Sequence, residues 1–287
     1  MTMPNNVTNV VIFHGDEQRI REILEAIQME DIGPGSIDFD KVILMPPSLN
    51  IECGSRTEQG LKLYTSFVKQ FLAEVEAGGS TSGNRQLSEQ YHKLREDEAF
   101  RLGEQAYHNL QEYGHATWYS WSNEHWATKW NAYGFEYLGE PEAGTVRFYT
   151  AWAPPHPVLE KLAERYPEIG FTHRWADEDI ERNCGEREYK PGGQMEEYIP
   201  LNESKEAYEL AADIQRSDLS EYGLFLTEDG DGYEYREEEE QDITIGRENK
   251  QQDRYQPYQT GDIGFSFGTA DLGEKRGGHP STVPSHG

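Results

Sequence analysis

The sequence predicts an α+β fold in which two β-α-β units form one antiparallel sheet with helices on one face. Residues 7–13 are short, apolar and β-branched, as in a strand. A helix is predicted next, because apolar residues recur on one helical face at Ile20, Ile23, Leu24 and Ile27. A second strand–helix–strand pattern follows over residues 145–176. Two such units in series are the ferredoxin-like arrangement.

The first unit is closed by a strand predicted at residues 37–44. Asp16 stands where the N-cap of the intervening helix is expected. Gly33 and Gly35 end that helical unit, and apolar residues then alternate, although imperfectly, at Ile37, Phe39, Val42 and Leu44.

The second unit begins with a predicted hairpin of residues 131–137 and 145–152 around a turn rich in Gly and Pro. Pro154 and Pro155 suit the first turn of the next helix. Residues 170–176 then alternate as a strand, and residues 185–190 and 195–199 are predicted to pair as a further hairpin.

A helical hairpin is predicted between the two units, at about residues 57–114. Apolar residues share a helical face over residues 57–77, and a second helical stretch covers residues 87–113. The Gly- and Ser-rich residues 78–83 between them predict a flexible break.

The predicted organisation has three parts. Residues 1–200 form the ferredoxin-like domain with its helical insertion. Residues 201–244 form a C-terminal extension with a short helix at 206–214 and short strands. Residues 245–287 are rich in Gln, Asp, Arg and Gly and follow an acidic run, which predicts a disordered tail.

Composition restricts the classes of partner. The 53 acidic residues outnumber the 26 basic ones and give a formal net charge of −27, which argues against binding to a nucleic-acid backbone. The acidic surface either serves solubility alone or imitates a polyanion. The two cysteines, Cys53 and Cys184, match no disulfide or zinc framework and suit a reducing cytoplasm, and no membrane span or secretion signal is apparent.

Residues 118–134 hold four of the six tryptophans and the first candidate site. Trp126 and Trp130 are spaced to share a helical face, with Lys129 and Asn131 beside them, and Trp152 follows on a strand. One interpretation is an aromatic platform with Lys and Asn donors for a base, a nucleotide or a peptide. The other is a set of core residues packed on the sheet.

A second candidate group surrounds the acidic run that begins at Asp177. If the chain stays extended there, Asp177 and Asp179 share one direction and provide oxygen ligands for Mg²⁺ or Ca²⁺. Apart from such an Mg²⁺ ion, no cofactor is expected. The alternative is that they are solvated or paired with Lys129 or Arg174. His173 is either a base or a structural histidine beside Trp175.

The catalytic classes that have short sequence motifs are disfavoured. The chain has no phosphate-binding loop, no dinucleotide-binding glycine motif, no histidine pair with metalloprotease spacing and no nucleophile elbow. The sequence assigns no catalytic residue, and a non-enzymatic role is expected.

Four ordered motifs resemble one known family. They are residues 37–46, residues 118–134, residues 150–155 (Thr-Ala-Trp-Ala-Pro-Pro) and residues 175–180 (Trp-Ala-Asp-Glu-Asp-Ile). In these the chain resembles the YubB-like ferredoxin-like-domain family of phages, prophages and conjugative plasmids, over roughly residues 7–198. It departs at His125, Trp126 and Ala127, where relatives usually have Asn-Trp-Gly. The resemblance implies a ferredoxin-like fold and a mobile-element origin, and it implies no activity.

Three functions are therefore considered. The first is an acidic accessory protein of a phage or plasmid that binds a host protein in the host cytoplasm, for counter-defence or nucleic-acid mimicry. The second is binding or hydrolysis of a nucleotide or another small ligand at the tryptophan and aspartate groups. The third is a structural protein of the phage particle.

Overall fold

The computed structural model describes residues 5–78, 81–139 and 142–236. A five-stranded antiparallel sheet with the order β2-β1-β3-β4-β5 organises this part of the chain. Its strands are Asn6–His14 (β1), Thr145–Ala151 (β2), Gly170–Asp177 (β3), Cys184–Lys190 (β4) and Gln194–Tyr198 (β5).

Seven helices accompany the sheet in the described residues. They are Glu17–Ile27 (α1), Ser55–Glu76 (α2), Thr81–Leu94 (α3), Glu98–Tyr113 (α4), Trp118–His125 (α5), His156–Arg165 (α6) and Lys205–Gln215 (α7). Short 3₁₀ helices lie at Phe39–Lys41 (η1), Pro47–Leu49 (η2), Phe135–Tyr137 (η3) and Leu219–Tyr222 (η4), and two small strands, Leu224–Leu226 (β6) and Tyr233–Tyr235 (β7), pair with each other.

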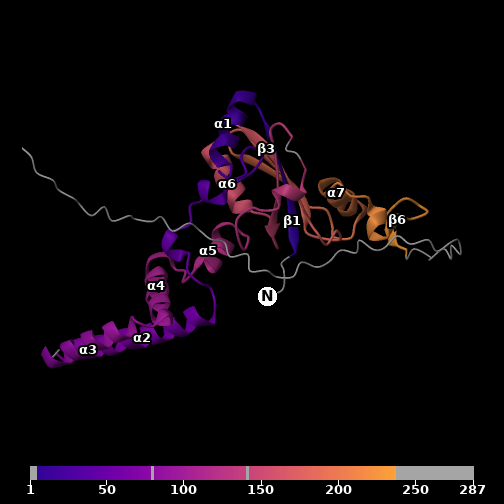
Figure 1. The fold of residues 1–287 in the computed structure, drawn as a ribbon. Helices are drawn as coiled ribbons and strands as arrows, with labels where there is room; N and C mark the ends of the chain where they lie inside the picture. The colour runs from indigo at the N-terminus through magenta and orange to yellow at the C-terminus, as the bar shows by residue number, and fades with distance from the viewer. Residues whose placement is uncertain (1–4, 79–80, 140–141, 237–287) are drawn as a thin grey trace, which may run out of the picture. The chain divides into compact units, whose positions relative to one another are not determined.

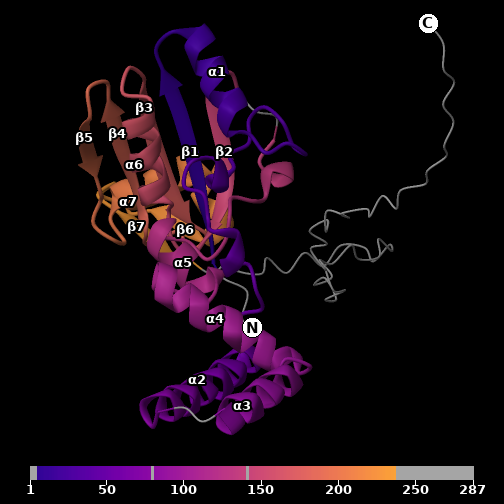
Figure 2. The same ribbon diagram turned by 90° about the vertical axis from the view of Figure 1, so that its left-hand side faces the viewer.

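The two faces of the sheet are covered by different helices. On one face α1 and α6 enclose the main core, in which Phe39, Phe148 and Leu159 are fully buried. On the other face Val10, Ala176 and Cys184 pack against α7. Figure 1 shows α1 and α6 on the left of the sheet and α7 on the right, and Figure 2 shows the order of the strands. The α+β, ferredoxin-like class is confirmed, and α7 adds a cover to the face opposite α1 and α6.

The second β-α-β unit forms as predicted. Strands β2 and β3 are joined through α6, and β1 lies between them and pairs with both. Strands β4 and β5 form the predicted hairpin around Gly192 and Gly193, both of which have positive φ. The predicted N-cap is also confirmed, since the Asp16 side chain accepts a hydrogen bond from the Arg19 backbone at 2.9 Å.

The strand predicted at residues 37–44 is wrong. Asp38 caps the 3₁₀ helix η1 by accepting from the Asp40 backbone, and Asp40 accepts from the Met45 backbone. These side-chain bonds to nearby backbone groups favour a turn over an extended strand. The apolar residues are buried all the same, because Phe39 packs edge-on against Trp126 and Phe148.

The strand predicted at residues 131–137 is reduced to a single bridge. Tyr133 exchanges both backbone hydrogen bonds with Tyr149, and the chain then turns into η3. The Thr128 hydroxyl continues this edge, donating to the Ala151 carbonyl and accepting from the Ala151 amide, both at 3.0 Å. Residues 128–133 therefore occupy the open edge of β2, where the missing strand of the first unit would pair.

The described residues between 55 and 113 form three helices, because the stretch predicted as one helix at 87–113 is divided between α3 and α4. Asp97 caps α4 by accepting from the Phe100 backbone. Helices α2 and α4 cross in close contact at Gly60 and Gly103. A Cβ added to Gly60 would lie 1.7 Å from the Ala99 carbonyl oxygen, so a larger residue would not fit there. Aromatic residues, among them Tyr64 and Phe100, fill the space beside this crossing.

The extension contains α7, η4 and the β6–β7 pair, described as far as Arg236. The tail predicted to be disordered, residues 245–287, lies outside the described residues. Among the helices that are described, none is both long enough and apolar enough to cross a membrane.

Candidate functional site

Three residues of the first candidate site, Lys129, Trp130 and Trp152, meet at one end of the sheet, where β1 begins and β2 and β3 end. Helix α5 stops at His125, and Ala127 adopts a left-handed conformation with φ of 61°. This turn separates the two indoles, so the continuous helix on which Trp126 and Trp130 would share a face does not form. Trp126 enters the core, and Trp130 stays beside Lys129 at the sheet end.

Lys129 lies between two indole rings. Its Nζ atom is 4.4 Å from the ring centroid of Trp130 and 5.1 Å from that of Trp152, while the residue as a whole is only 6% exposed. An ammonium group over an indole face is stabilised by the ring quadrupole. We call Lys129, Trp130 and Trp152 the aromatic–lysine cluster.

Trp152 is the exposed member of this cluster. It has φ of 72° and is 41% exposed. A bulky residue seldom adopts positive φ, because Cβ then crowds the backbone. The neighbouring hydrogen bonds hold it there, since the Trp152 amide donates to the Asn5 carbonyl and the Asn183 side chain donates to the Trp152 carbonyl.

Trp126 and Asn131 have structural positions. The Trp126 indole nitrogen donates to the Ile43 carbonyl at 3.0 Å. The Asn131 side chain accepts from the Phe39 backbone at 2.9 Å and donates to the Asp38 carboxylate at 2.7 Å. Both residues therefore fasten residues 38–43 to the tryptophan-rich segment.

The two aspartates have different partners. Asp177 is 7% exposed and accepts from the side chains of Asn5 and Asn183 and from the Asp179 backbone, so it caps the turn after β3. The Asp179 carboxylate pairs with Arg182 at 3.3 Å. The Mg²⁺ site stays a prediction, and its ligands would have to give up these bonds.

His173 and Trp175 are buried beneath α6. The His173 Nε2 atom lies 3.0 Å from the Asn9 side-chain oxygen. Because the Asn9 amide donates to Thr150 and to the Val7 carbonyl, its oxygen is the acceptor and Nε2 of His173 is the donor. The His173 ring also stacks on Trp175, with centroids 5.1 Å apart.

Burial keeps two histidines neutral, His173 beneath α6 and His156 at the start of α6. Removal from water lowers the pKa of His173 well below its ordinary value and lowers the pKa of His156 to about 4. The Nδ1 atoms of both rings lack hydrogen-bond partners among the described residues. His173 is therefore placed in the core, away from the aromatic–lysine cluster.

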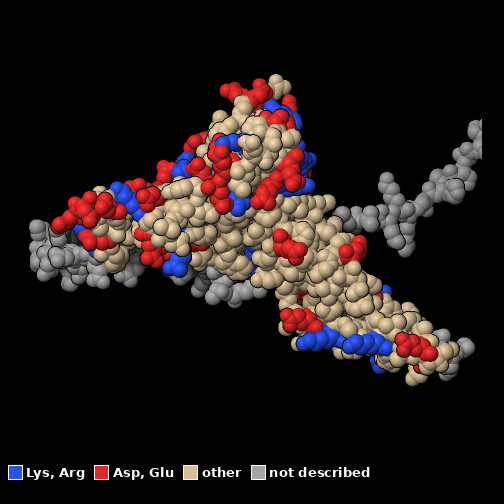
Figure 3. All heavy atoms as spheres, turned by 180° about the vertical axis from the view of Figure 1, so that it is seen from behind, with Lys and Arg blue, Asp and Glu red and all other residues tan. Residues whose placement is uncertain are grey.

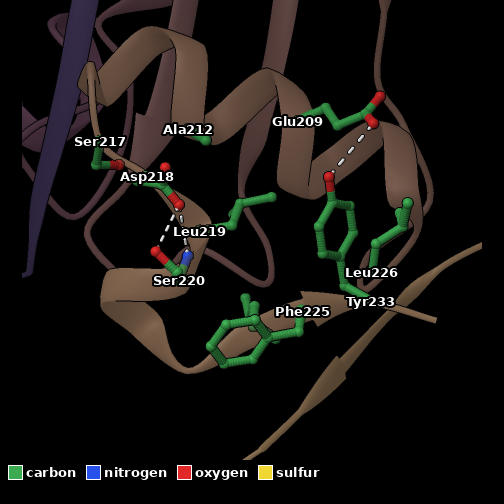
Figure 4. Close-up of a pocket in the computed structure, with 10 residues that line it drawn as sticks. Glu209, Ala212, Ser217, Asp218, Leu219, Ser220, Phe225, Leu226 and Tyr233 are labelled. Carbon is green, nitrogen blue, oxygen red and sulfur yellow. Dashed lines mark hydrogen bonds between the residues drawn. The ribbon is translucent and has the colours of Figure 1, made fainter.

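Two further groups were not predicted from the sequence. One is an open pocket of about 450 Å³ beside α7, drawn in Figure 4. It is lined by Glu209, Ala212, Ser217, Asp218, Leu219, Ser220, Leu224, Phe225, Leu226 and Tyr233. The other is a set of potential metal ligands, made of His115 just after α4 and of Glu124 and His125 at the end of α5. The residues of neither group recur at the spacing of a known binding motif, so the sequence alone does not indicate them.

A family comparison agrees with this architecture. Residues 123–218 match the family described as "Ferredoxin-like domain in Api92-like protein". The matched region is a ferredoxin-like domain. The match begins in α5 and ends after α7, so it includes β2, α6 and β3 but not β1. Searches of the curated proteins and of the solved structures gave no match.

Proposed function

We propose that the protein is a non-enzymatic accessory protein of a phage or plasmid, which binds a cationic host protein through its acidic surface. The partner belongs to the host proteins that handle nucleic acid, because a surface that binds a polyanion is complementary to a dense array of carboxylates. The protein acts in the host cytoplasm. The observation that carries the proposal is the concentration of acidic residues in the C-terminal extension.

The described part of this extension, residues 201–236, contains ten acidic and three basic residues. Its bases have partners within the chain: Lys205 donates to the Gly230 carbonyl, Arg216 pairs with Glu142, and Arg236 pairs with Glu234. Figure 3 shows red carboxylate residues gathered over this region, at the left end of the view. Most of the carboxylates are therefore left to attract a cationic partner.

The acidic surface of the extension contains the pocket beside α7. Leu219, Leu224 and Phe225 provide apolar lining, while Glu209 and Asp218 provide carboxylates. Hydrogen bonds from the Ser220 hydroxyl and backbone lower the pKa of Asp218, so that it stays ionised at neutral pH. Such a pocket fits the aliphatic stem and charged head of a lysine or arginine side chain.

The test uses immobilised full-length protein and the heparin-binding protein fraction of a bacterial lysate. We expect retention at moderate salt, release by high salt and displacement by duplex DNA. Substituting Glu206→Gln, Glu209→Gln and Asp218→Asn together should weaken retention about tenfold, if each surface charge contributes about 0.5 kcal/mol.

The matched control removes the same charge from exposed positions of the helical insertion, by Glu58→Gln and Glu76→Gln in α2 and Glu96→Gln in the turn between α3 and α4. It should retain the fraction like the wild type. If both triple variants lose retention equally, net charge alone explains the binding and the C-terminal extension has no special role. If duplex DNA does not displace the retained proteins, the protein does not imitate nucleic acid. Abundance of the protein in purified virions would favour the structural role instead.

A second candidate function is nucleotide or small-ligand binding at the aromatic–lysine cluster. The exposed Trp152 ring, held at positive φ over the buried Lys129, supports it, because an exposed indole can stack on a base. Titration with mononucleotides should quench tryptophan fluorescence in the wild type and not in Trp152→Ala. An unchanged titration in that variant would reject the cluster as the binding site.

A further inference from the structure

The turn between α4 and α5 brings together three side chains of the types that bind transition metals. Helix α4 ends at Tyr113, its C-cap Gly114 has a left-handed conformation, and His115 follows this cap. Glu124 and His125 lie in the last turn of α5. One potential ligand atom from each of His115, Glu124 and His125 lies within 4.8 Å of the other two.

The spacing of two of these atoms suits an ion between them. The Nε2 atom of His115 is 3.4 Å from a carboxylate oxygen of Glu124. Zinc–ligand bonds of about 2.0–2.1 Å in tetrahedral geometry place neighbouring ligand atoms about 3.4 Å apart. A direct N–H···O hydrogen bond is typically about 2.9 Å long. The observed separation therefore matches two ligands of one ion better than a hydrogen-bonded pair.

Both imidazoles are held by their other nitrogen. The Nδ1 atom of His125 lies 3.0 Å from the Trp121 carbonyl oxygen and donates to it, which leaves the lone pair on Nε2. The Nδ1 atom of His115 lies 3.1 Å from the Ser120 hydroxyl. The His125 ring also stacks on Trp121, with centroids 4.4 Å apart and planes 7° from parallel. Contacts of this kind orient histidine ligands in metal sites.

We propose that His115, Glu124 and His125 bind one zinc ion. Two imidazoles and one carboxylate suit zinc, whereas Mg²⁺ and Ca²⁺ prefer oxygen ligands alone. Three protein ligands leave a fourth position for water, as in open zinc sites. His115 is 9% exposed while the Glu124 side chain is 70% exposed, so an ion has access from the solvent side.

This site would connect the inserted helices to the core of the sheet. His115 directly follows α4, whereas Trp121 of α5 is buried in the main core. The positive ion would also lie at the C-terminal end of α5, where the helix dipole favours a cation. The proposal is independent of the acidic extension and of the aromatic–lysine cluster.

The test is a titration of the untagged, full-length protein with zinc chloride after treatment with a chelator, followed by calorimetry and tryptophan fluorescence. We expect saturation at one ion per chain and a change in emission, because Trp121 stacks on the ligand His125. Glu124→Gln and His125→Asn should each weaken zinc binding at least about tenfold, the lower limit for loss of an outer-shell partner.

Two control variants make the result specific. His108→Asn removes an exposed histidine of α4, and Cys53→Ser removes a free thiol, a group of the type that zinc accepts as a ligand. Both variants should bind zinc like the wild type, because neither residue belongs to the proposed site. Because Glu124 is exposed, Glu124→Gln should keep the fold, which circular dichroism of the metal-free protein checks. Absence of saturable binding, equal affinity in Glu124→Gln, or loss of binding in Cys53→Ser would overturn the proposal.

Discussion

At the scale of single residues, three polar side chains are buried in the sheet and joined by hydrogen bonds. The sequence pattern predicted the strands that carry them but not this network. His173, Asn9 and Thr150 are each fully buried and linked by hydrogen bonds, and the Thr150 hydroxyl continues the chain to the Ala153 carbonyl. Buried polar groups are tolerated when they are paired. The arrangement requires a neutral imidazole at His173, which makes stability depend on pH.

The free energy of unfolding should fall as the pH decreases from about 6.5 to about 4. The pKa of His156 is about 4 in the folded protein, against 6.5 for an ordinary histidine, and that of His173 is also lowered. Between these values the unfolded chain binds protons that the folded chain does not, so acid favours unfolding. The contribution of these neutral histidines to the free energy of unfolding is fully present above pH 6.5, and it is lost as the pH falls towards their pKa in the folded protein. Urea unfolding at pH 7.5, 6.0 and 5.0 measures it.

Substitution of His156 separates this effect from the titration of carboxylates. His156→Gln should show a shallower decrease in stability between pH 7.5 and pH 5.0 than the wild type. His92→Gln, which removes an exposed histidine of α3, serves as the matched control and should follow the wild-type profile. Parallel profiles for the wild type and His156→Gln would show that this imidazole stays accessible to protons in the fold.

At the scale of elements, the sequence predicted the strands and helices whose partners are close in the chain. The β2-α6-β3 unit and the β4–β5 hairpin both have regular apolar patterns and short connections. Residues 37–44 also have apolar alternation, but their backbone is fixed by Asn131, more than 90 residues away, which binds Phe39 and Asp38. No local pattern reveals this distant partner. The local signal is the pair Asp38 and Asp40, whose carboxylates accept from the backbones of Asp40 and Met45 and favour a turn, although the apolar alternation predicts a strand.

The candidate site was also predictable only in part, because its arrangement depends on contacts between residues that are distant in the sequence. The tryptophan-rich segment does reach the end of the sheet, and it places Lys129 beside Trp130 and Trp152. The sequence did not separate these residues from Trp126 and Asn131, because aromatic and amide side chains serve a core and a ligand equally well. The break that separates them is the left-handed Ala127, a conformation that alanine rarely adopts.

At the scale of the whole molecule, excess negative charge opposes compact structure. The chain has 53 acidic and 26 basic residues, so even complete pairing would leave 27 carboxylates without a basic partner. Ion pairs such as those of Arg187 with Glu160 and Glu197 relieve the repulsion locally on the sheet. Most of the other ion pairs among the described residues join exposed side chains, such as Lys161 with Glu164, and such pairs contribute only about 0–1 kcal/mol each. Repulsion among the excess carboxylates should therefore dominate the salt dependence of stability.

Thermal stability should therefore increase with sodium chloride. Raising the concentration from 0.1 M to 1 M shortens the screening length from about 10 Å to about 3 Å, which weakens repulsion across the surface more than it weakens contacts within ion pairs. A gain of about 1 kcal/mol would raise the melting temperature by about 2–4 °C. Differential scanning calorimetry at pH 7.5, where His156 is neutral, measures the shift, and the Glu206→Gln, Glu209→Gln and Asp218→Asn triple variant should show a smaller one. A melting temperature that stays constant or falls with salt would mean that the ion pairs stabilise the fold more than the excess charge destabilises it.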